Sequence, residues 1–317
     1  MCKKAILNIA QSEQVKNRVS ELSKRSEDVK SRVALTLKAL WLPERELAVL
    51  SRLEIFQELK DRFPHFIEVI NLIESNAIAF SKLELPFECP PILLQGDPGL
   101  GKTYFISELA RLVEFPLYEI SMATMTASFA LTGSNIQWAE GTVGFIAKSI
   151  ANSRIANPII LIDEIDKCSG SHKFDPLNVF YSLLEPHSAK RFKDEALEIE
   201  LDVSRVIWIA TANYINRIPE PILSRVRVID IQSPTSLQMI SIIESIYSNF
   251  RLSKPYGALM SPTIDDDTMH LLTMKSPREA RVAIDIGCLS AIRENRNQLR
   301  PSDIAMSKKE HHHVGFY

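Results

Sequence analysis

The most constraining feature of the sequence is a glycine-rich segment that matches the pattern GxxxxGK[ST], Gly96-Asp97-Pro98-Gly99-Leu100-Gly101-Lys102-Thr103. It follows a short apolar run at 92–95 and precedes a stretch with helical periodicity that continues to Glu114. In such an arrangement, the backbone N–H groups of the loop surround phosphates at a helix N-terminus. The pattern assigns Lys102 to the β- and γ-phosphates of ATP and the Thr103 hydroxyl to Mg²⁺. The segment, extended by Tyr104, is therefore our predicted nucleotide-binding loop.

A second motif consists of four apolar residues, 159–162, followed by Asp163 and Glu164. Two acids at the end of a strand can be merely solvated, but their place about sixty residues after Thr103 favours a Walker B motif. Asp163 then holds the hydration shell of Mg²⁺, while Glu164 orients and deprotonates the attacking water. Because Glu164 supplies a base, the motif predicts hydrolysis in addition to nucleotide binding.

Two polar residues downstream complete the predicted catalytic set. Asn213 follows the apolar run 206–210, at a strand end where ligands bind in open α/β folds, and is assigned to positioning the water. Arg225 ends a short helical segment and is our candidate for an arginine finger. A finger supplied by a neighbouring subunit stabilises charge on the γ-phosphate in the transition state, so catalysis would require assembly. Arg227 is either a surface residue or an alternative finger.

The order of four segments gives the sequence a specific resemblance. GDPGLGKT, LIDEIDK, the stretch from Asp175 to Asn213 and IPEPILSRVRVI resemble the ATPase core of the Lon family, over about Pro90 to Glu294. The resemblance implies an AAA+ P-loop ATPase that forms a hexameric ring with nucleotide sites between subunits. It also makes Arg278 similar to the sensor-2 arginine at the start of a lid helix, although an ordinary first-turn surface arginine fits the same position.

The resemblance extends to the segment 133–141, in which Trp138 stands at the position of the aromatic residue in the Lon pore loop. Large flat side chains lose little conformational entropy and can grip an extended polypeptide irrespective of its sequence. A buried core tryptophan is the alternative, but the polar and glycine residues beside Trp138 favour a loop. Lys173 and Phe174 are a weaker second candidate for a pore loop.

The alternation of apolar runs with helical stretches predicts an α/β fold with a parallel sheet flanked by helices. The runs with the length of strands are 92–95, 117–120, 159–162, 206–210 and 226–231. We expect an N-terminal helical region at 1–80, a large α/β subdomain at 81–233, and a small helical lid subdomain with a tail at 234–317. The helices expected in the lid are 237–250, 265–274 and 278–294.

In the N-terminal region, apolar residues from Val15 to Leu40 recur at spacings of four and three, with polar interruptions, and predict one long amphipathic helix. This helix is either a coiled-coil or docking arm or a helix packed on its own bundle. Pro43 fits the first turn of a second helix that runs to Leu59, and Pro64 fits the start of a third. The first eighty or so residues are therefore expected to be all-helical.

Composition limits the class of protein. Apolar residues make up 45% of the chain and charged residues 24%, as in ordinary globular proteins, and a net charge of -2 gives no support for nucleic-acid binding. The four cysteines form no CxxC pair, and no run of about 18 apolar residues occurs. We expect no zinc site, no membrane span and a cytoplasmic location. His311, His312 and His313 are interpreted as an inert tail in preference to a metal site.

Only about twenty residues follow the last expected helix, too few for the serine and lysine protease domain that follows the lid in Lon. The sequence therefore predicts a homo-oligomeric ring motor, without its own protease, that uses ATP and Mg²⁺ to remodel or unfold a protein substrate through a central pore. One alternative is a nucleotide-gated assembly or adaptor protein whose N-terminal region recruits a separately encoded effector. Another is a DNA-acting AAA+ motor.

Overall fold

The structure, a computed structural model, describes residues 5–125, 127–138, 141–168 and 175–306. The chain divides into two compact units, which we describe separately. The first unit contains the described residues up to Ile55, Asn71–Gln95 and Thr103–Asp230. The second contains Phe56–Ile70, Gly96–Lys102 and the described residues from Ile231 onward. None of the described helices combines the length and apolar character needed to cross a bilayer.

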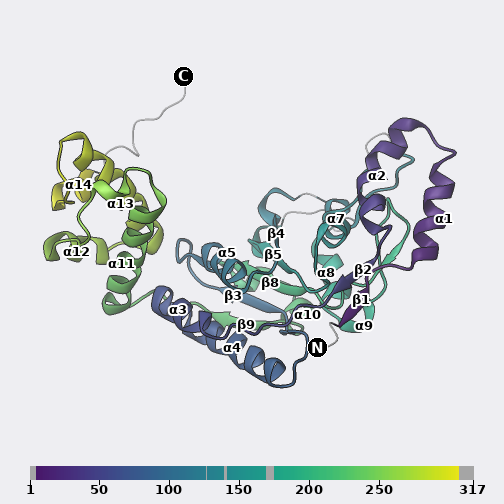
Figure 1. Cartoon of the computed structure of the whole chain (residues 1–317), viewed down its shortest axis with the longest axis horizontal. Coiled ribbons are helices and arrows are strands. Elements are labelled where there is room, and N and C mark those ends of the chain that lie inside the picture. The colour runs from purple at the N-terminus through teal and green to yellow at the C-terminus, as the bar shows by residue number, and fades with distance from the viewer. Residues whose placement is uncertain (1–4, 126, 139–140, 169–174, 307–317) are drawn as a thin grey trace. The chain divides into compact units, whose positions relative to one another are not determined.

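A five-stranded sheet lies at the centre of the first unit (Figure 1). Its strands, in spatial order, are β4 (Leu117–Ser121), β5 (Ile159–Asp163), β8 (Ile207–Ala212), β3 (Ile92–Gln95) and β9 (Arg227–Asp230). All four pairings are parallel. The three central strands are almost continuously buried, as expected when helices cover both faces of a sheet. The predicted α/β fold class is confirmed, and each of the five predicted strands is present.

Helices and short turns connect and flank these strands. The helices that follow β3 in the first unit are α5 (Lys102–Val113), α6 (Phe129–Thr132), α7 (Phe145–Asn152), α8 (Leu177–Leu183), α9 (Pro186–Ala189) and α10 (Glu220–Leu223). A small antiparallel pair, β6 (Phe192–Lys193) and β7 (Glu200–Leu201), lies between α9 and β8 in sequence. Single 3₁₀ turns, Met122–Thr124, Ile165–Lys167 and Ile215–Arg217, follow the carboxyl ends of β4, β5 and β8.

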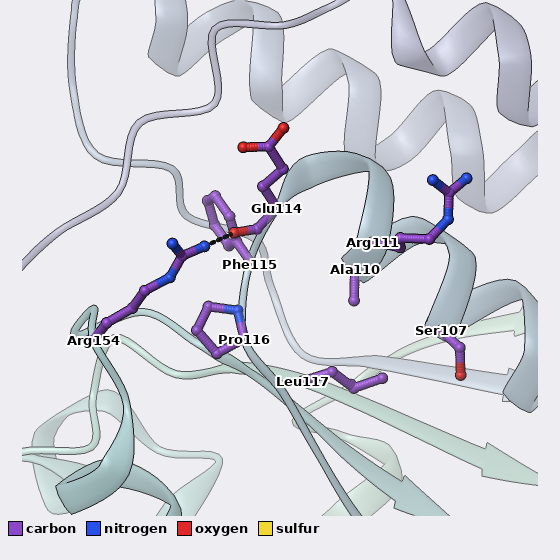
Figure 2. Close-up of a pocket in the computed structure, with 8 residues that line it drawn as sticks. All are labelled: Ser107, Ala110, Arg111, Glu114, Phe115, Pro116, Leu117 and Arg154. Carbon is purple, nitrogen blue, oxygen red and sulfur yellow. Dashed lines mark hydrogen bonds between the residues drawn. The ribbon is translucent and has the colours of Figure 1, made fainter.

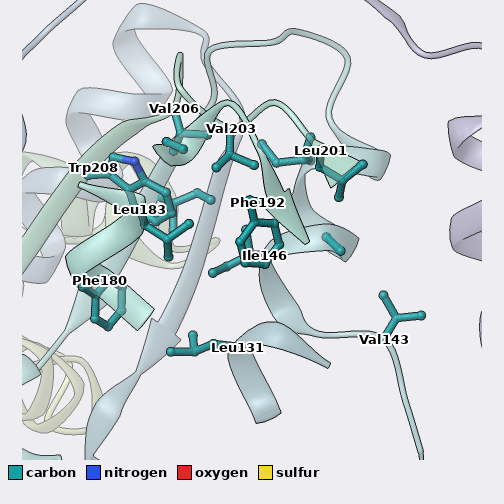
Figure 3. Close-up of a cluster of buried hydrophobic side chains, with 14 of the residues drawn as sticks. Leu131, Val143, Ile146, Phe180, Leu183, Phe192, Leu201, Val203, Val206 and Trp208 are labelled. Atoms are coloured by element: carbon teal, nitrogen blue, oxygen red, sulfur yellow. The ribbon is translucent and has the colours of Figure 1, made fainter. Parts of the chain in front are cut away.

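The apolar core of this unit lies between the sheet and the helices on one of its faces (Figure 3). Phe180 of α8 and Trp208 of β8 meet edge to face, with ring centroids 6.5 Å apart. Ile146 of α7 and Leu201 of β7 extend the same buried cluster. The aromatic pair stabilises the packing of α8 on β8, since such pairs add about 0.5 to 1.5 kcal/mol to simple burial.

The N-terminal segment forms two helices, α1 (Ser12–Leu22) and α2 (Glu27–Leu40), so the prediction of one long helix was wrong. Ser26 takes an extended backbone conformation at the N-cap of α2, and the acids Glu27 and Asp28 occupy the first turn. The acids in the first turn interact favourably with the helix dipole and so favour a new helix start here, whereas the Ser26 side chain makes no capping hydrogen bond. The apolar residues that suggested one helix are instead shared by a helical hairpin, whose inner side chains join the core of the first unit.

Two short strands also contradict the expectation of an all-helical N-terminal region. β1 (Ile6–Asn8) pairs antiparallel with β2 (Glu44–Glu46), where a helix beginning at Pro43 was predicted. The Glu-Arg-Glu sequence favours a helix locally, but pairing with a distant segment overrides that propensity. Arg45 stabilises β2 by donating hydrogen bonds to the carbonyls of Ala151 and Ser153 at the end of α7.

Helices α3 (Ile55–Arg62) and α4 (Ile67–Lys82) follow, separated by a 3₁₀ turn at Pro64–Phe66. Pro64 therefore begins a helical turn as predicted. The carboxyl-terminal helices of the second unit are α11 (Ser236–Ser253), α12 (Asp266–Thr273), α13 (Pro277–Arg293) and α14 (Pro301–Met306). The first three confirm the helices predicted from periodicity, and capping boxes at Thr235 and Ser276 fix the starts of α11 and α13.

Candidate nucleotide site

The predicted nucleotide-binding loop encloses a lysine. Lys102, at the first position of α5, is 8% exposed, and its Nζ donates hydrogen bonds to the carbonyls of Gly96 at 2.6 Å and Asp97 at 3.0 Å. Gly99 and Gly101 have φ values of 88° and 89°, a left-handed conformation in which any other residue would be strained. The backbone of the loop thus curves around the Lys102 ammonium group. Asp97 and Pro98 are exposed on the loop, Leu100 is buried, and Tyr104 in the first turn of α5 is half-buried.

Two other segments of the second unit contact this loop. The backbone N–H of Arg278, in the first turn of α13, donates to the Gly99 carbonyl at 3.2 Å, and the Arg278 side chain is exposed. His65, in the turn Pro64–Phe66, places Nε2 2.9 Å from the Leu100 carbonyl. Burial lowers the pKa of His65, which favours the neutral ring with the proton on Nε2. His65 was not singled out from the sequence, because no local motif marks it.

In the first unit, three oxygen-bearing side chains meet at the carboxyl edge of the sheet. The Thr103 hydroxyl, in the first turn of α5, donates to Asp163 Oδ1 at 2.9 Å, and the Thr211 hydroxyl donates to the same oxygen at 2.6 Å. The parallel register explains the meeting, because it places Ile162 beside Ala210 and so brings the next residues of β5 and β8 together. The structure therefore places Thr103 and Asp163 together, and it adds Thr211.

Glu164 follows β5 in an unusual conformation, with φ 55° and ψ 47°. Its backbone N–H donates to the Thr211 hydroxyl at 2.9 Å, so this one buried hydroxyl contacts both acids of the predicted Walker B motif. The Glu164 carboxylate forms an ion pair with Lys167, and the hydrogen bond that the Lys167 ammonium donates to it raises the pKa of Lys167. Glu119, on the neighbouring strand β4, has its pKa raised by burial and by the charge of Asp163. The carboxyl edge is thus strongly acidic.

Asn213, which follows β8 at the same edge, is half-buried. The next residue, Tyr214, donates its backbone N–H to Asp166 Oδ2 at 3.1 Å, and Asp166 is itself buried. This bond joins the turn after β5 to the turn after β8 and holds Asn213 near the end of its strand. Asp166 was missed in the sequence, although it lies three residues after Asp163 in the same motif.

Arg225, the predicted arginine finger, lies just after α10. Its Nη1 donates to the Pro221 carbonyl at 2.6 Å, and its Nε lies 3.7 Å from Glu185 Oε2. The side chain is one-third exposed, and its partners are Pro221 within α10 and Glu185 just before α9. Arg227 is exposed at the start of β9. A role for Arg225 in the site of another subunit remains a prediction.

Trp138 is 61% exposed, so it is not a core residue. It lies between α6 and α7, in a loop whose stem is closed by a hydrogen bond from Ser134 N–H to the Thr142 carbonyl at 2.9 Å. Its neighbours Ala139 and Glu140 are outside the described residues. The predicted second pore-loop residues Lys173 and Phe174, and the histidines of the tail, His311, His312 and His313, are also outside them.

A cavity of about 500 Å³ lies elsewhere, at the opposite end of α5 (Figure 2). Figure 2 shows Arg154 donating to the Glu114 carbonyl beside Phe115 and Pro116. The predicted phosphate-binding residues are at the start of α5, and a helix of 12 residues is about 18 Å long. This cavity therefore does not belong to the candidate nucleotide site.

Comparisons with known proteins agree with this geometry. Residues 92–233 match the family model described as "ATPase family associated with various cellular activities (AAA)". Residues 92–233 form an AAA domain. The matched segment begins at β3 and ends just after β9, so the AAA domain contains the whole five-stranded sheet together with Lys102, Asp163 and Glu164.

Curated relatives of the chain are Lon proteases. The Lon protease of Mycoplasma mobile is 36% identical over 201 residues, which are 62% of this chain and 24% of the relative. That of Campylobacter jejuni is 30% identical over 223 residues, 70% of this chain and 28% of the relative. The chain thus spans about a quarter of the length of these relatives. The resemblance to the Lon ATPase module is confirmed over the AAA domain.

Solved structures with the same fold include Hsp104 of S. cerevisiae in an Hsp104:casein complex, with a TM-score of 0.63 and 14% identity over 90% of this chain and 57% of that one. The Thermotoga maritima RuvB Holliday junction branch migration motor has a TM-score of 0.51 and 15% identity, over 77% of this chain and 68% of that one. These similarities establish the AAA+ P-loop fold.

Proposed function

We propose that this AAA domain drives an ATP-hydrolysing ring motor that remodels or unfolds a protein substrate through a central pore. The observation that best supports this proposal is the meeting of Thr103, Asp163 and Thr211 at the start of α5, with Glu164 as the next residue after the shared carboxylate. A site that only binds nucleotide needs the loop that contains Lys102. It does not need a second acid, Glu164, beside the predicted Mg²⁺ ligands.

The donor set fits Mg²⁺. The Thr103 hydroxyl and the Asp163 carboxylate are hard oxygen ligands, and they already lie within 2.9 Å of one another. These two residues would hold the ion, with Thr211 orienting Asp163. When bound, Mg²⁺ would neutralise charge on the β- and γ-phosphates of ATP.

Each remaining residue has a role that follows from its position. Lys102 would exchange its bonds to the loop carbonyls for phosphate oxygens. Glu164, which pairs with Lys167, would accept a proton from the attacking water, and Asn213 would help to position that water. Arg225 of a neighbouring subunit would stabilise the γ-phosphate charge, and Arg278 would report the nucleotide state to α13.

A protein substrate is favoured by two observations. The curated relatives that share 30% to 36% identity are named proteases, whereas the RuvB motor shares only the fold. Trp138 presents a large exposed aromatic surface on a loop, which suits a grip on a polypeptide of any sequence. We infer a homo-oligomeric, hexameric ring that acts in the cytoplasm on a protein substrate or together with a separately encoded effector.

The decisive experiment uses Glu164→Gln protein with ATP and magnesium. We expect it to retain ATP, to release phosphate at less than about 1% of the wild-type rate, and to form closed rings whose subunits can be counted by electron microscopy. Lys102→Ala is the control and should fail to hold nucleotide. Wild-type protein that stays monomeric and releases no phosphate at high concentration would overturn the proposal, and full turnover by Glu164→Gln would overturn the assignment of the base.

A further inference from the structure

The loop that contains Trp138 is closed at its stem within the AAA domain. Gly144, at the end of the loop, donates its N–H to Asp194 Oδ2 at 2.8 Å, in addition to the bond between Ser134 and Thr142. The Asp194 carboxylate is buried and also accepts N–H groups from Ala196 and Leu197. The stem is therefore rigid, but these bonds do not reach the tip of the loop where Trp138 lies.

The tip is held from a different part of the chain. Arg32, on helix α2, donates from Nη1 to the carbonyls of Trp138 at 3.0 Å and Gly141 at 3.3 Å. Its Nη2 forms an ion pair with Asp28 Oδ2 at 2.7 Å, one helical turn earlier. The Arg32 side chain is only 17% exposed, so these bonds are partly shielded from water.

Helix α2 is a firm base for this contact. On α2, Val33, Leu37 and Leu40 are buried in the main core of the first unit, beside residues of α7. The ion pair with Asp28, on the same helix, holds the Arg32 guanidinium in one orientation independently of the loop. A planar guanidinium that is already oriented loses less conformational entropy on forming each hydrogen bond than a flexible lysine would.

We propose that Arg32 is a positioning residue that couples helix α2 to the substrate-contacting loop and fixes the height at which Trp138 is presented. The inference rests on the proposed role of Trp138. An exposed aromatic side chain on a loop without such a restraint would sample many positions, and a pulling motion would then be transmitted poorly to the bound polypeptide. A charge-assisted bond to each of two carbonyls at the tip supplies this restraint.

Hydrogen exchange tests the geometric part of the inference. The Trp138 N–H donates to the Asn135 carbonyl and the Gly141 N–H to the Trp138 carbonyl, so both amides report on the order of the tip. In Arg32→Ala, we expect these amides to exchange about tenfold faster. A hydrogen bond from a charged donor is strong enough that its loss changes the equilibrium between the closed and open tip by about a factor of ten. Asp28→Asn, which keeps both carbonyl contacts, should show a smaller increase.

A matched control is available on α1. Arg18 is similarly shielded, pairs with Glu198 and donates to the Ala196 carbonyl, so Arg18→Ala removes an anchor of the same hairpin without touching the loop tip. This variant should leave exchange at Trp138 and Gly141 unchanged. Equal exchange at the tip in Arg32→Ala and wild type, or equal acceleration by Arg18→Ala, would overturn the inference.

The functional part uses unfolding of a model substrate protein by the assembled chain. Arg32→Ala should keep its basal ATP turnover within about twofold of wild type but lose substrate unfolding about tenfold, whereas Arg32→Lys should recover part of it. Trp138→Ala separates the proposed pore role of Trp138 from the proposed positioning role of Arg32. If Trp138→Ala unfolds substrate normally, the proposed pore role of Trp138 is wrong. If Trp138→Ala loses substrate unfolding but Arg32→Ala keeps it, the proposed role of Arg32 is wrong.

Discussion

Replacement of Thr211 by valine tests whether the buried hydroxyl organises the acids of the AAA domain. Valine has nearly the shape of threonine but no hydroxyl, so the change removes the bond to Asp163 Oδ1 at 2.6 Å and the acceptor of the Glu164 N–H at 2.9 Å. Thr211 is 2% exposed, so water cannot easily replace either bond. The substitution therefore isolates the two hydrogen bonds from packing.

The size of the effect follows from these contacts. A hydrogen bond to a charged group contributes about 1.5 to 3 kcal/mol, and a buried N–H left without an acceptor costs about 1 to 3 kcal/mol. The methyl group that replaces the hydroxyl recovers about 0.8 kcal/mol through apolar burial. Thr211→Val should thus lower the free energy of unfolding of the first unit by about 2 to 5 kcal/mol. It should also slow ATP turnover, because Asp163 and Glu164 both lose a hydrogen bond to Thr211.

Urea unfolding and steady-state phosphate release measure the two effects. Thr211→Ser is the matched control: it keeps the hydroxyl and loses only a methyl group, so its loss should be about 1 kcal/mol with turnover close to wild type. A Thr211→Val protein with the wild-type urea midpoint and wild-type turnover would refute the reasoning. If Thr211→Val and Thr211→Ser lowered the free energy of unfolding by the same amount, the effect would be due to packing and not to hydrogen bonding.

Three further predictions concern other parts of the chain. Mixing Arg225→Ala with Lys102→Ala protein should partly restore phosphate release, because an intact site then forms wherever one variant's finger meets the other's loop; no recovery after proven mixing would contradict a finger from the neighbour. Burial lowers the pKa of His65 in the folded chain, so as the pH falls the histidine of the unfolded chain binds a proton at a higher pH than that of the folded chain. The stability contributed by the neutral ring is therefore present above about pH 6.5 and is lost as the pH falls below it. Wild type should therefore lose ATP affinity from pH 7 to 5 more steeply than His65→Asn, which keeps a donor for the Leu100 carbonyl, and parallel pH profiles would argue against this. Asp194→Ala leaves three buried N–H groups without their acceptor and should lower the free energy of unfolding, measured in urea, by at least about 3 kcal/mol; an unchanged midpoint would refute its role as the anchor of the loop stem.

Much of the AAA domain was predictable because its signals are local. Each buried strand is a short continuous apolar run, and the run at 92–95 became β3 with those bounds. Lys102, Thr103, Asp163 and Glu164 were assigned from spacing within two short motifs, and the structure brings Thr103 and Asp163 into contact. Strand, loop and helix in this order allow few other arrangements.

The contacts that sequence reasoning missed are between segments far apart in the chain. Thr211 looked like one more residue in a strand, and its importance appears only once β8 pairs with β5. The bond between His65 and the Leu100 carbonyl spans 35 residues, and those from Arg32 to the loop of Trp138 span more than a hundred. Strand β2 was missed for the same reason, because its partner β1 lies at the other end of the helical hairpin.

The backbone of Glu164 shows why local propensity could not complete the site. A non-glycine residue in the left-handed region costs about 1 to 2 kcal/mol, so sequence rules would place a glycine or asparagine there. The structure offsets this cost with a hydrogen bond from the Glu164 N–H to Thr211, and the chain then turns at once into the helix of Ile165–Lys167, where Lys167 pairs with the carboxylate. A glycine would relieve the strain but would remove the proposed base. Strain retained at an acid, together with a buried hydroxyl that compensates for it, is the arrangement expected where a residue is kept for chemistry and not for stability.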